Sequence, residues 1–460
     1  MERLIGFLGL AVFIGIAILF SRDRRAIHWK TVGWGIGLQW IFALMVLKGA
    51  AISAWFSHTL HLPAWPRGLG WGVIALMAAP ALLRRFARFS DKRLNWGIFS
   101  AVVLALLWGN LLGTAFDRVR IGVEHLMDFA KAGASFVFGN LANPGSSVGL
   151  VFAFVVLPTI IFVASIFAIL YYLGVMQVVV GACARAMGRI LKVSGAESVS
   201  VAASILMGQT EAPLTIRPFL AKFTRSELMT IMTAGMAHVS GSIMVAYVQI
   251  AHVDIVHLIT AVIMTAPGAV MMAKILEPET ETPATGGEIK VEIPNEDANI
   301  LDAAARGAGE GGQLAFNVAV MLVAFIALVA LVNGLFKIIH PGLSMEAIMA
   351  VVFRPFAFLM GVPWHEAGQI GALLGKRMVI NEFVAFIELG SLTHLSAKAK
   401  LISTFALCGF ANFSSIAIQI GGIGALIPER RGDLARLGLR AMMAGTLANF
   451  MSACIAGILS

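Results

Sequence analysis

The sequence predicts an all-α polytopic membrane protein in which an inverted repeat, made of a re-entrant hairpin plus a broken helix plus a helix, is held in a helical scaffold. Of its 460 residues, 59% are hydrophobic and 13% are charged, whereas soluble domains carry about 25% charged residues. Apolar runs of roughly 20 residues recur along the chain, each long enough to span a bilayer. Polar residues also interrupt the apolar sequence at two corresponding places in its second half.

The membrane spans are expected where the apolar runs are longest. In chain order they are residues 4–20, 32–47, a weaker pair at 69–83 and 96–116, then 151–173, 228–248, 256–273, 314–336, 401–427 and 441–459. The first run is followed by the charged sequence SRDRR and not by a small-residue cleavage site. We therefore expect it to be a retained span.

The basic residues set the expected orientation and argue against nucleic acid as a partner. The net charge of +9 comes from short clusters between apolar runs, at 22–25, 84–93, 185–192, 217–225 and 430–440. These clusters fall on one side of the membrane if segments 196–214 and 370–389 turn back without crossing. The positive-inside rule then places both termini outside. Cys183, Cys408 and Cys454 show no metal-ligand spacing and are interpreted as packing residues.

The polar segments between spans complete the expected organisation. The linker 277–312 begins as EPETETPATGGE and becomes amphipathic in NILDAAARGAGEGG, which predicts a cytoplasmic loop and then a helix on the membrane surface. A second surface helix is expected on the outer side at 344–360. Lys376 with Arg377 is expected to form an outer loop-tip or snorkelling pair, with a gating ion pair to Glu366 as the alternative. The resulting units are 1–116 (N-terminal helices with an extra pair), 117–174 (outer surface helix and scaffold span), 175–276 (first repeat), 277–313 (linker and surface helix), 314–360 (scaffold span and outer surface helix) and 361–460 (second repeat).

The two repeats place polar groups at membrane depth. SILMGQTEAPL precedes an apolar helix broken at GMAHVSGS, and GKRMVINEFVAF precedes one broken at GFANFSS. Discontinuous helices expose backbone dipoles to a solute near the bilayer midplane. One such break is also a common structural feature of membrane helices. Two in corresponding positions, preceded by the carboxylates Glu211 and Glu382, instead favour a binding site for a small polar molecule.

These segments resemble the concentrative nucleoside transporter family. GQTEAPLTIRPFL, MTAGMAHVSGSIMVAYV, NEFVAF and GFANFSSIAIQIGG match its signatures in order and spacing, and the resemblance covers about residue 151 to the C-terminus and, more weakly, the first two spans. Residues 49–116, with the extra helix pair, do not match the compact bacterial members. The resemblance implies a cation-driven nucleoside symporter of the bacterial cytoplasmic (inner) membrane, assembled in lipid as a homotrimer around 314–336.

The resemblance also implies a set of substrate-binding residues. The nucleobase of a uridine-, cytidine- or adenosine-type nucleoside would be bound by Gln209, Thr210, Glu211 and Ile243. The ribose would be bound by Glu382, Asn412 and Ser415, with Phe410 beside them. The chemistry of these groups agrees, because ribose hydroxyls donate well to a carboxylate and an amide presents both a donor and an acceptor to a base.

The coupling-ion positions depart from the pattern of sodium-driven members. There, an Asn and a Ser or Thr coordinate the ion, whereas this chain has Ser204 and His238, with Met207 and Val239 as backbone carbonyl donors. Histidine titrates near neutral pH and is a poor ligand for sodium. The sequence therefore favours H⁺ over Na⁺ as the coupling cation. Sodium bound by other groups stays open, and no other metal or cofactor is expected.

Two other classes of function compete with symport. An intramembrane enzyme would use Glu211 and Glu382 as an acid–base pair, but the chain has no Ser/His/Asp arrangement, no HExxH motif and no nucleotide loop. The protein is therefore not expected to be an enzyme. A channel, a facilitator or an ion exchanger for another small polar solute would need only the re-entrant segments.

Overall fold

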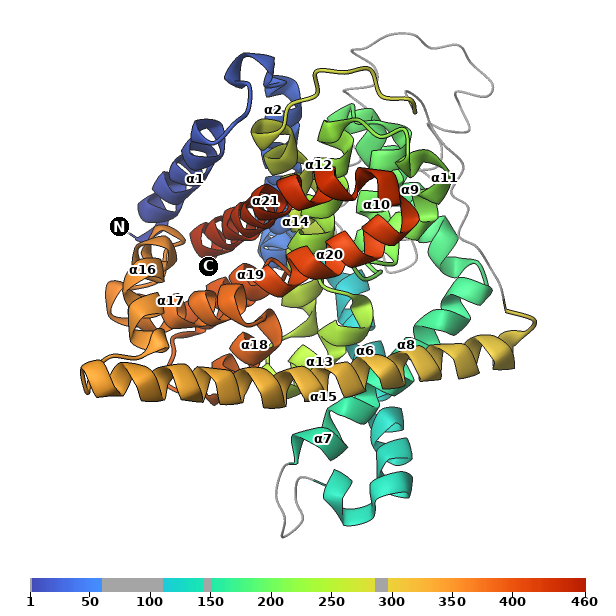
Figure 1. Ribbon diagram of the computed structural model, residues 1–460, viewed down its shortest axis with the longest axis vertical. Coiled ribbons are helices and arrows are strands. Elements are labelled where there is room, and N and C mark those ends of the chain that lie inside the picture. The colour runs from blue at the N-terminus through green and yellow to red at the C-terminus, as the bar shows by residue number, and fades with distance from the viewer. Residues whose placement is uncertain (1, 60–110, 144–150, 286–296) are drawn as a thin grey trace.

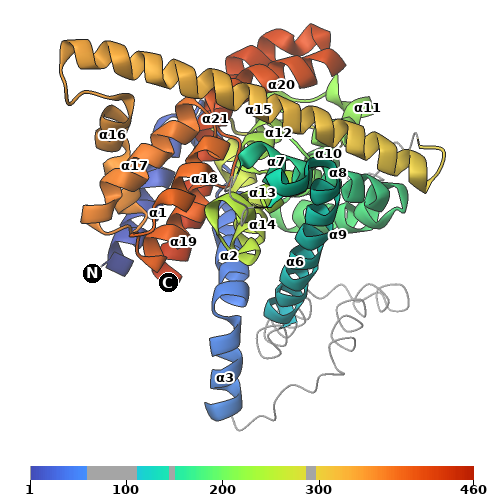
Figure 2. The same ribbon diagram turned by 90° about the horizontal axis from the view of Figure 1, so that it is seen from below.

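The computed structural model describes residues 2–59, 111–143, 151–285 and 297–460, and this part of the chain is helical (Figure 1). Apolar segments in lipid form helices because every backbone N–H and C=O must then bond within its own segment. Figure 2 shows α3 projecting away from the body of the molecule. The N-terminal elements are α1 (Glu2–Leu19), η1 (Arg24–Ala26), α2 (Trp29–Leu47), α3 (Gly49–Thr59), α6 (Leu111–Phe138), η2 (Gly139–Ala142), α7 (Phe152–Val155), α8 (Leu157–Tyr172) and α9 (Val175–Leu191).

The first repeat follows α9. It consists of a hairpin, a helix broken in its middle and a long helix, in that order. Its hairpin and broken helix both begin with a capping box, at Ser194 and at Thr224, which satisfies the first backbone N–H groups. The elements are α10 (Gly195–Ser204), η3 (Ala212–Ile216), α11 (Arg217–Leu220), α12 (Arg225–Ala237), α13 (Gly241–Ala251) and α14 (Ile255–Leu276).

The second repeat has the same order of elements. Its hairpin is α17 and α18, its broken helix is α19 and α20, and its long helix is α21. Between the repeats lie α15 and α16, and a bend of 118° separates α16 from α17. The elements are α15 (Ile300–Ile339), α16 (Met345–Leu359), α17 (Trp364–Val379), α18 (Glu382–Ser391), α19 (Ala397–Leu407), α20 (Phe413–Leu426), η4 (Pro428–Arg430) and α21 (Arg431–Leu459).

The predicted fold class is confirmed, with differences in detail. Six helices of the described ranges are long and apolar enough to cross a membrane, or seven if the bent pair of α16 and α17 counts as one span. Both predicted helix breaks are present, at residues 238–240 and 408–412. The last helix begins ten residues before the expected 441. The expected span at 69–83 lies outside the described residues. So does the part of the expected span at 96–116 that precedes residue 111.

The separate surface helix expected at the end of the linker is absent from the described chain. One helix of 40 residues, α15, runs without interruption from Ile300 to Ile339, a length of about 60 Å. No proline and no turn separates its amphipathic beginning from its apolar end, so nothing stops the helix at residue 313. Both views show α15 extended along one side of the molecule (Figures 1 and 2).

Small residues let α15 cross α8 at close range. A Cβ on Gly307 would lie 2.5 Å from the Cβ of Ala168, and one on Gly311 would lie 2.7 Å from the Cβ of Ala164. This Gly-x-x-x-Gly spacing brings two helix backbones together, as in other membrane helix pairs. At the same crossing Ser165 donates a hydrogen bond to the carbonyl of Ala304 at 2.9 Å.

A charged cluster joins the ends of four segments near the first repeat. The carboxylate of Glu277 has a side chain only 2% exposed and lies 2.7 Å from Arg22, 2.9 Å from Arg225 and 3.6 Å from Arg440. The hydrogen bond that Arg22 donates to Glu277 raises the pKa of Arg22. We call these four residues the Glu277 cluster. It ties the α1–α2 connection to α12, to the end of α14 and to α21.

The two broken helices meet at their breaks. The backbone N–H of Phe410 donates to the carbonyl of His238 at 3.2 Å, so the interruption of α19–α20 is bonded to that of α12–α13. Gly409 allows this approach, because a Cβ there would lie 2.7 Å from the carbonyl oxygen of Ala237 and 2.5 Å from Oδ1 of Asn449.

We expect the substitution Gly409→Ala to push the two breaks apart and to lower the stability by about 1–3 kcal/mol, the usual cost of overpacking. The measurement is the melting temperature of the purified protein in detergent. Gly421→Ala, in α20, is the matched control, because a Cβ there meets nothing within 4 Å. Equal melting temperatures for the two variants would contradict this packing.

Candidate functional site

The helix breaks leave backbone carbonyl groups without a hydrogen bond inside their own helix, and side chains from other helices bond to them. Arg377, from α17, is 2% exposed and reaches the break at the end of α19. Its guanidinium donates to the carbonyls of Ala406 at 2.5 Å and Gly409 at 3.2 Å, and to Oδ1 of Asn449 at 2.5 Å. The expectation of a loop-tip position for Arg377 is therefore wrong, because these buried acceptors need a donor and the guanidinium supplies several.

Asn449, from α21, completes the same arrangement. Its Nδ2 donates to the carbonyl of Ala237 at 2.9 Å and to that of Cys408 at 3.0 Å. One amide thus bonds the last turn of α12 and the break after α19, while its oxygen is bonded to Arg377. The sequence alone did not point to Asn449. An amide within the otherwise apolar run 441–459 is the signal that could have found it.

Glu382 lies at the first position of α18, where the positive end of the helix dipole stabilises a carboxylate. It is 5% exposed and accepts hydrogen bonds from Tyr247 Oη at 2.9 Å and from Asn412 Nδ2 at 3.1 Å. Tyr247 is buried in α13 and stacks on Phe386 with ring centroids 4.2 Å apart. Tyr247 is a site residue that the sequence did not reveal, because a lone tyrosine in an apolar helix has no distinctive spacing.

A chain of hydrogen bonds leads from Glu382 to the first repeat. Asn412 caps α20, and its Oδ1 accepts from the backbone N–H of Ser415 at 2.9 Å. Ser415 Oγ in turn accepts from Nε2 of Gln209 at 3.2 Å. The structure thus brings Gln209, Glu382, Asn412 and Ser415 together in one buried polar group, which we call the polar chain.

The other predicted substrate-binding residues belong to the first hairpin, to α13 and to the second break. Thr210 packs on α20, where a Cβ on Gly422 would lie 2.6 Å from its methyl group. Ile243 is buried in α13 and Phe410 is half-buried at the break. Glu211 does not join the polar chain, because its side chain is turned toward its own loop and accepts from the N–H of Gly208 at 3.1 Å. The Glu211 residue is exposed.

The predicted coupling-ion residues form a separate buried pair at the first break. Ser204 Oγ lies 2.7 Å from Nδ1 of His238 and donates its proton to the carbonyl of Val201 at 2.8 Å. A hydroxyl that donates to this carbonyl accepts from Nδ1–H, so the geometry of the pair fits the tautomer that carries its hydrogen on Nδ1. The other nitrogen, Nε2, is then an acceptor, and it has no partner within the described part of the chain although His238 is 1% exposed. Val239 is buried and Met207 is half-buried beside this pair.

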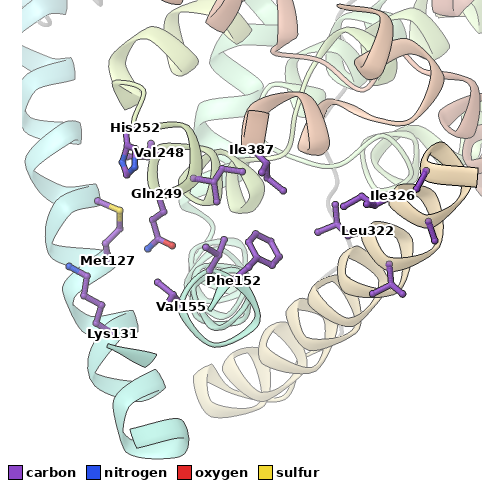
Figure 3. Close-up of a pocket in the computed structure, with 15 residues that line it drawn as sticks. Met127, Lys131, Phe152, Val155, Val248, Gln249, His252, Leu322, Ile326 and Ile387 are labelled. Carbon is purple, nitrogen blue, oxygen red and sulfur yellow. The ribbon is translucent and has the colours of Figure 1, made fainter. Parts of the chain in front are cut away.

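A large cavity elsewhere in the structure is apolar. It has a volume of about 950 Å³ and lies between α6, α7, α13, α15 and α18 (Figure 3). Two of the polar groups at its wall are already engaged: Gln249 donates to Thr159 at 3.0 Å, and Lys131 pairs with Asp128 at 3.2 Å. The described residues that line it include no carboxylate. A ribose would therefore find no acceptor of the kind that Glu382 provides.

The polar chain can bind a small polar molecule, and it lacks the parts of a hydrolytic centre. It combines a carboxylate, two amides and one hydroxyl group within an apolar shell, which is the composition of a site that orients a solute by hydrogen bonds. Within the residues described, no group of three or more His, Cys, Asp or Glu side chains could hold a metal ion.

Comparisons with known proteins agree with this description. Residues 8–61 match the family model for the N-terminus of Na⁺-dependent nucleoside transporters, and residues 257–457 match the model for their C-terminus. Residues 153–253 match a model described as nucleoside recognition.

Similar proteins include transporters from bacteria and from mammals. The chain is 40% identical to the uncharacterized transporter YutK of Bacillus subtilis over the full length of both. It is 34% identical to solute carrier family 28 member 3 of Rattus norvegicus, and it spans 59% of that longer protein. The structure of CNTnw in an inward-facing substrate-bound state superimposes with a TM-score of 0.81 at 37% identity, covering 100% of this chain and 99% of that one.

The fold, the polar chain and these relatives define a membrane transporter and not an enzyme. The chain belongs to the concentrative nucleoside transporter family, as its four signature segments predict.

We expect Arg377→Met to lower the stability markedly, because it leaves Ala406 O, Gly409 O and Asn449 Oδ1 without their donor. Each buried acceptor without a partner costs about 1–3 kcal/mol. The melting temperature in detergent measures the loss. Lys376→Met is the matched control, since Lys376 pairs with carboxylates nearer the surface and its loss should be smaller. A larger effect at Lys376 would contradict the assignment.

Proposed function

We propose that the protein is a secondary active symporter that imports nucleosides of the uridine, cytidine or adenosine type, driven by a cation gradient. The observation that carries the proposal is the polar chain, in which Gln209 of the first repeat is bonded through Ser415 and Asn412 to Glu382 of the second. A solute bound there would contact both repeats at once. Its binding can therefore be linked to a movement of the repeats.

In this proposal the two ends of the polar chain bind different parts of the nucleoside. Glu382, Asn412 and Ser415 bind the ribose hydroxyls, because a carboxylate with two donors already in place keeps lone pairs for two more. The base lies against the first hairpin. It is bound there by Gln209, Thr210 and Glu211, with Ile243 and Phe410 packing beside it. Glu211 would turn from its own loop toward the base when the solute is present.

We propose H⁺ as the coupling cation, in preference to Na⁺. The pair of Ser204 and His238 occupies the position where the resemblance places the cation, and the free Nε2 of His238 is a proton acceptor. Imidazole nitrogen is a poor ligand for a hard cation such as sodium, which prefers oxygen. The backbone carbonyls of Met207 and Val239 are the oxygen donors that remain for the alternative.

The remaining parts of the proposal concern assembly and location. The protein is a homotrimer in the bacterial cytoplasmic membrane, packed around α15, with lipid at its outer surface. Residues 175–276 and 361–460 form the moving transport unit, and 117–174 with 314–360 form the scaffold. The exposed apolar side chains of α15, among them Phe316, Val323 and Leu331, support its contact with lipid or with other subunits.

Glu382→Ala is expected to abolish uptake of labelled uridine into cells while the protein still reaches the membrane, because the ribose loses its acceptor. Glu211→Ala is expected to do the same at the base. Glu388→Ala, in the same helix as Glu382 but paired with Lys376, should keep most of the uptake. Full uptake by either of the first two variants would remove that residue from the site.

Accumulation distinguishes symport from the alternatives. Proteoliposomes containing the purified protein should concentrate uridine above the outside level when a cation gradient is imposed. Equilibration without accumulation would instead identify a facilitator, and exchange without net uptake would identify an exchanger for another small polar solute.

The coupling cation is tested by removing the sodium gradient and the proton gradient in turn. Uptake should persist when sodium is replaced by choline and should be lost when a protonophore is added. His238→Gln should keep nucleoside binding but lose the response to an imposed pH gradient, because an amide side chain does not gain or lose a proton near neutral pH. Loss of uptake on removal of sodium alone would contradict proton coupling.

A further inference from the structure

A buried glutamine outside the polar chain contacts its first member. Gln419, in α20, is 0% exposed. Its Nε2 donates to Oε1 of Gln209 at 3.2 Å and to the backbone carbonyl of Met232, in α12, at 3.0 Å. Both N–H groups of Gln419 are therefore used, while its Oε1 has no partner in the described ranges.

The backbone determines which way the Gln419 amide points. A carbonyl oxygen such as that of Met232 can only accept, so the NH₂ group of Gln419 must face it. The second N–H then meets Gln209, which must present its Oε1. Gln209 in consequence directs its own NH₂ group toward Ser415, as the 3.2 Å bond between them requires.

The backbone of α12 is shaped to admit both glutamines. A Cβ on Gly235 would lie 2.6 Å from Nε2 of Gln419 and 3.1 Å from Cβ of Gln209. Only glycine leaves room for this contact. The two amides are therefore held against the backbone of α12. Rotating either amide by half a turn would bring NH₂ to NH₂ or oxygen to oxygen.

We propose that Gln419 is a positioning residue that sets the hydrogen-bond polarity of the base-binding end of the site. With Gln419 in place, one N–H of Gln209 is bonded to Ser415 and the other has no partner in the described part of the chain. The base-binding end of the site thus offers a donor and selects nucleobases that present a carbonyl oxygen there. The inference rests on the proposed function and deepens it.

Gln419→Glu is the test that reverses the polarity. A carboxylate at this position accepts only, so it would attract the NH₂ group of Gln209 and turn its oxygen toward Ser415 and the base. Uridine presents a carbonyl oxygen at C4 beside an N–H at N3, whereas cytidine presents an amino group at C4 beside an acceptor nitrogen at N3. We expect the ratio of their KM values to shift by about tenfold in favour of cytidine, the usual weight of one buried hydrogen bond, with maximal rates little changed.

Gln419→Met provides a second variant if the carboxylate prevents folding. It keeps the length of the side chain but frees the Gln209 amide to rotate, so the KM values of uridine and cytidine should converge. Gln39→Met is the matched control, because Gln39 is equally buried and bonds to Gly35 and Ser452 in α2 and α21. It should lower stability without moving the ratio.

The outcomes separate the two proposals. A KM ratio that stays at the wild-type value in Gln419→Met, or in a folded Gln419→Glu, overturns the role of Gln419 while leaving nucleoside transport intact. A wild-type protein that takes up no nucleoside overturns the proposed function and this inference together.

Discussion

The structure depends on two buried side chains that satisfy the backbone at the helix breaks. An interrupted helix in apolar surroundings leaves carbonyl groups unpaired, and each costs several kcal/mol in hydrocarbon. Arg377 and Asn449 supply the missing donors from two other helices. Both come from the second repeat, yet Asn449 reaches the break of the first. The two repeats therefore cannot separate at this point without exposing backbone groups of both.

The breaks that need this support also create the site. Where a helix stops and restarts, its new N-terminus presents polar caps and a favourable dipole to the interior. Asn412 caps α20 after the second break and Glu382 begins α18 after the hairpin turn, so the carboxylate and the amide that donates to it both lie at helix N-termini. The two ends of the second break therefore have different partners. On one side Arg377 donates hydrogen bonds to the carbonyls at the end of α19, and on the other the N-terminus of α20 faces the polar chain.

Much of this could be predicted from local sequence. The two breaks and the residues of the polar chain lie in short polar signatures within apolar runs, so their pattern is visible without coordinates. Arg377 was misplaced because a cation at a hairpin can face water or buried carbonyls, and only the position of α19 decides between them. Gln419 and Tyr247 lie in largely apolar helices, and their roles depend on partners that are distant in the chain. The continuity of α15 was missed because a change from amphipathic to apolar composition does not by itself end a helix.

The Glu277 cluster has a consequence for the order of events during synthesis. Arg22 and its carboxylate partner are separated by 255 positions, so the ribosome makes the cation roughly tens of seconds before the anion, at about 5–20 residues per second. During that interval the Arg22 guanidinium lacks the acceptor that it has in the folded protein. The α1–α2 connection can therefore be fastened to the first repeat only after the end of α14 has been synthesised, and the cluster is complete only once Arg440 follows.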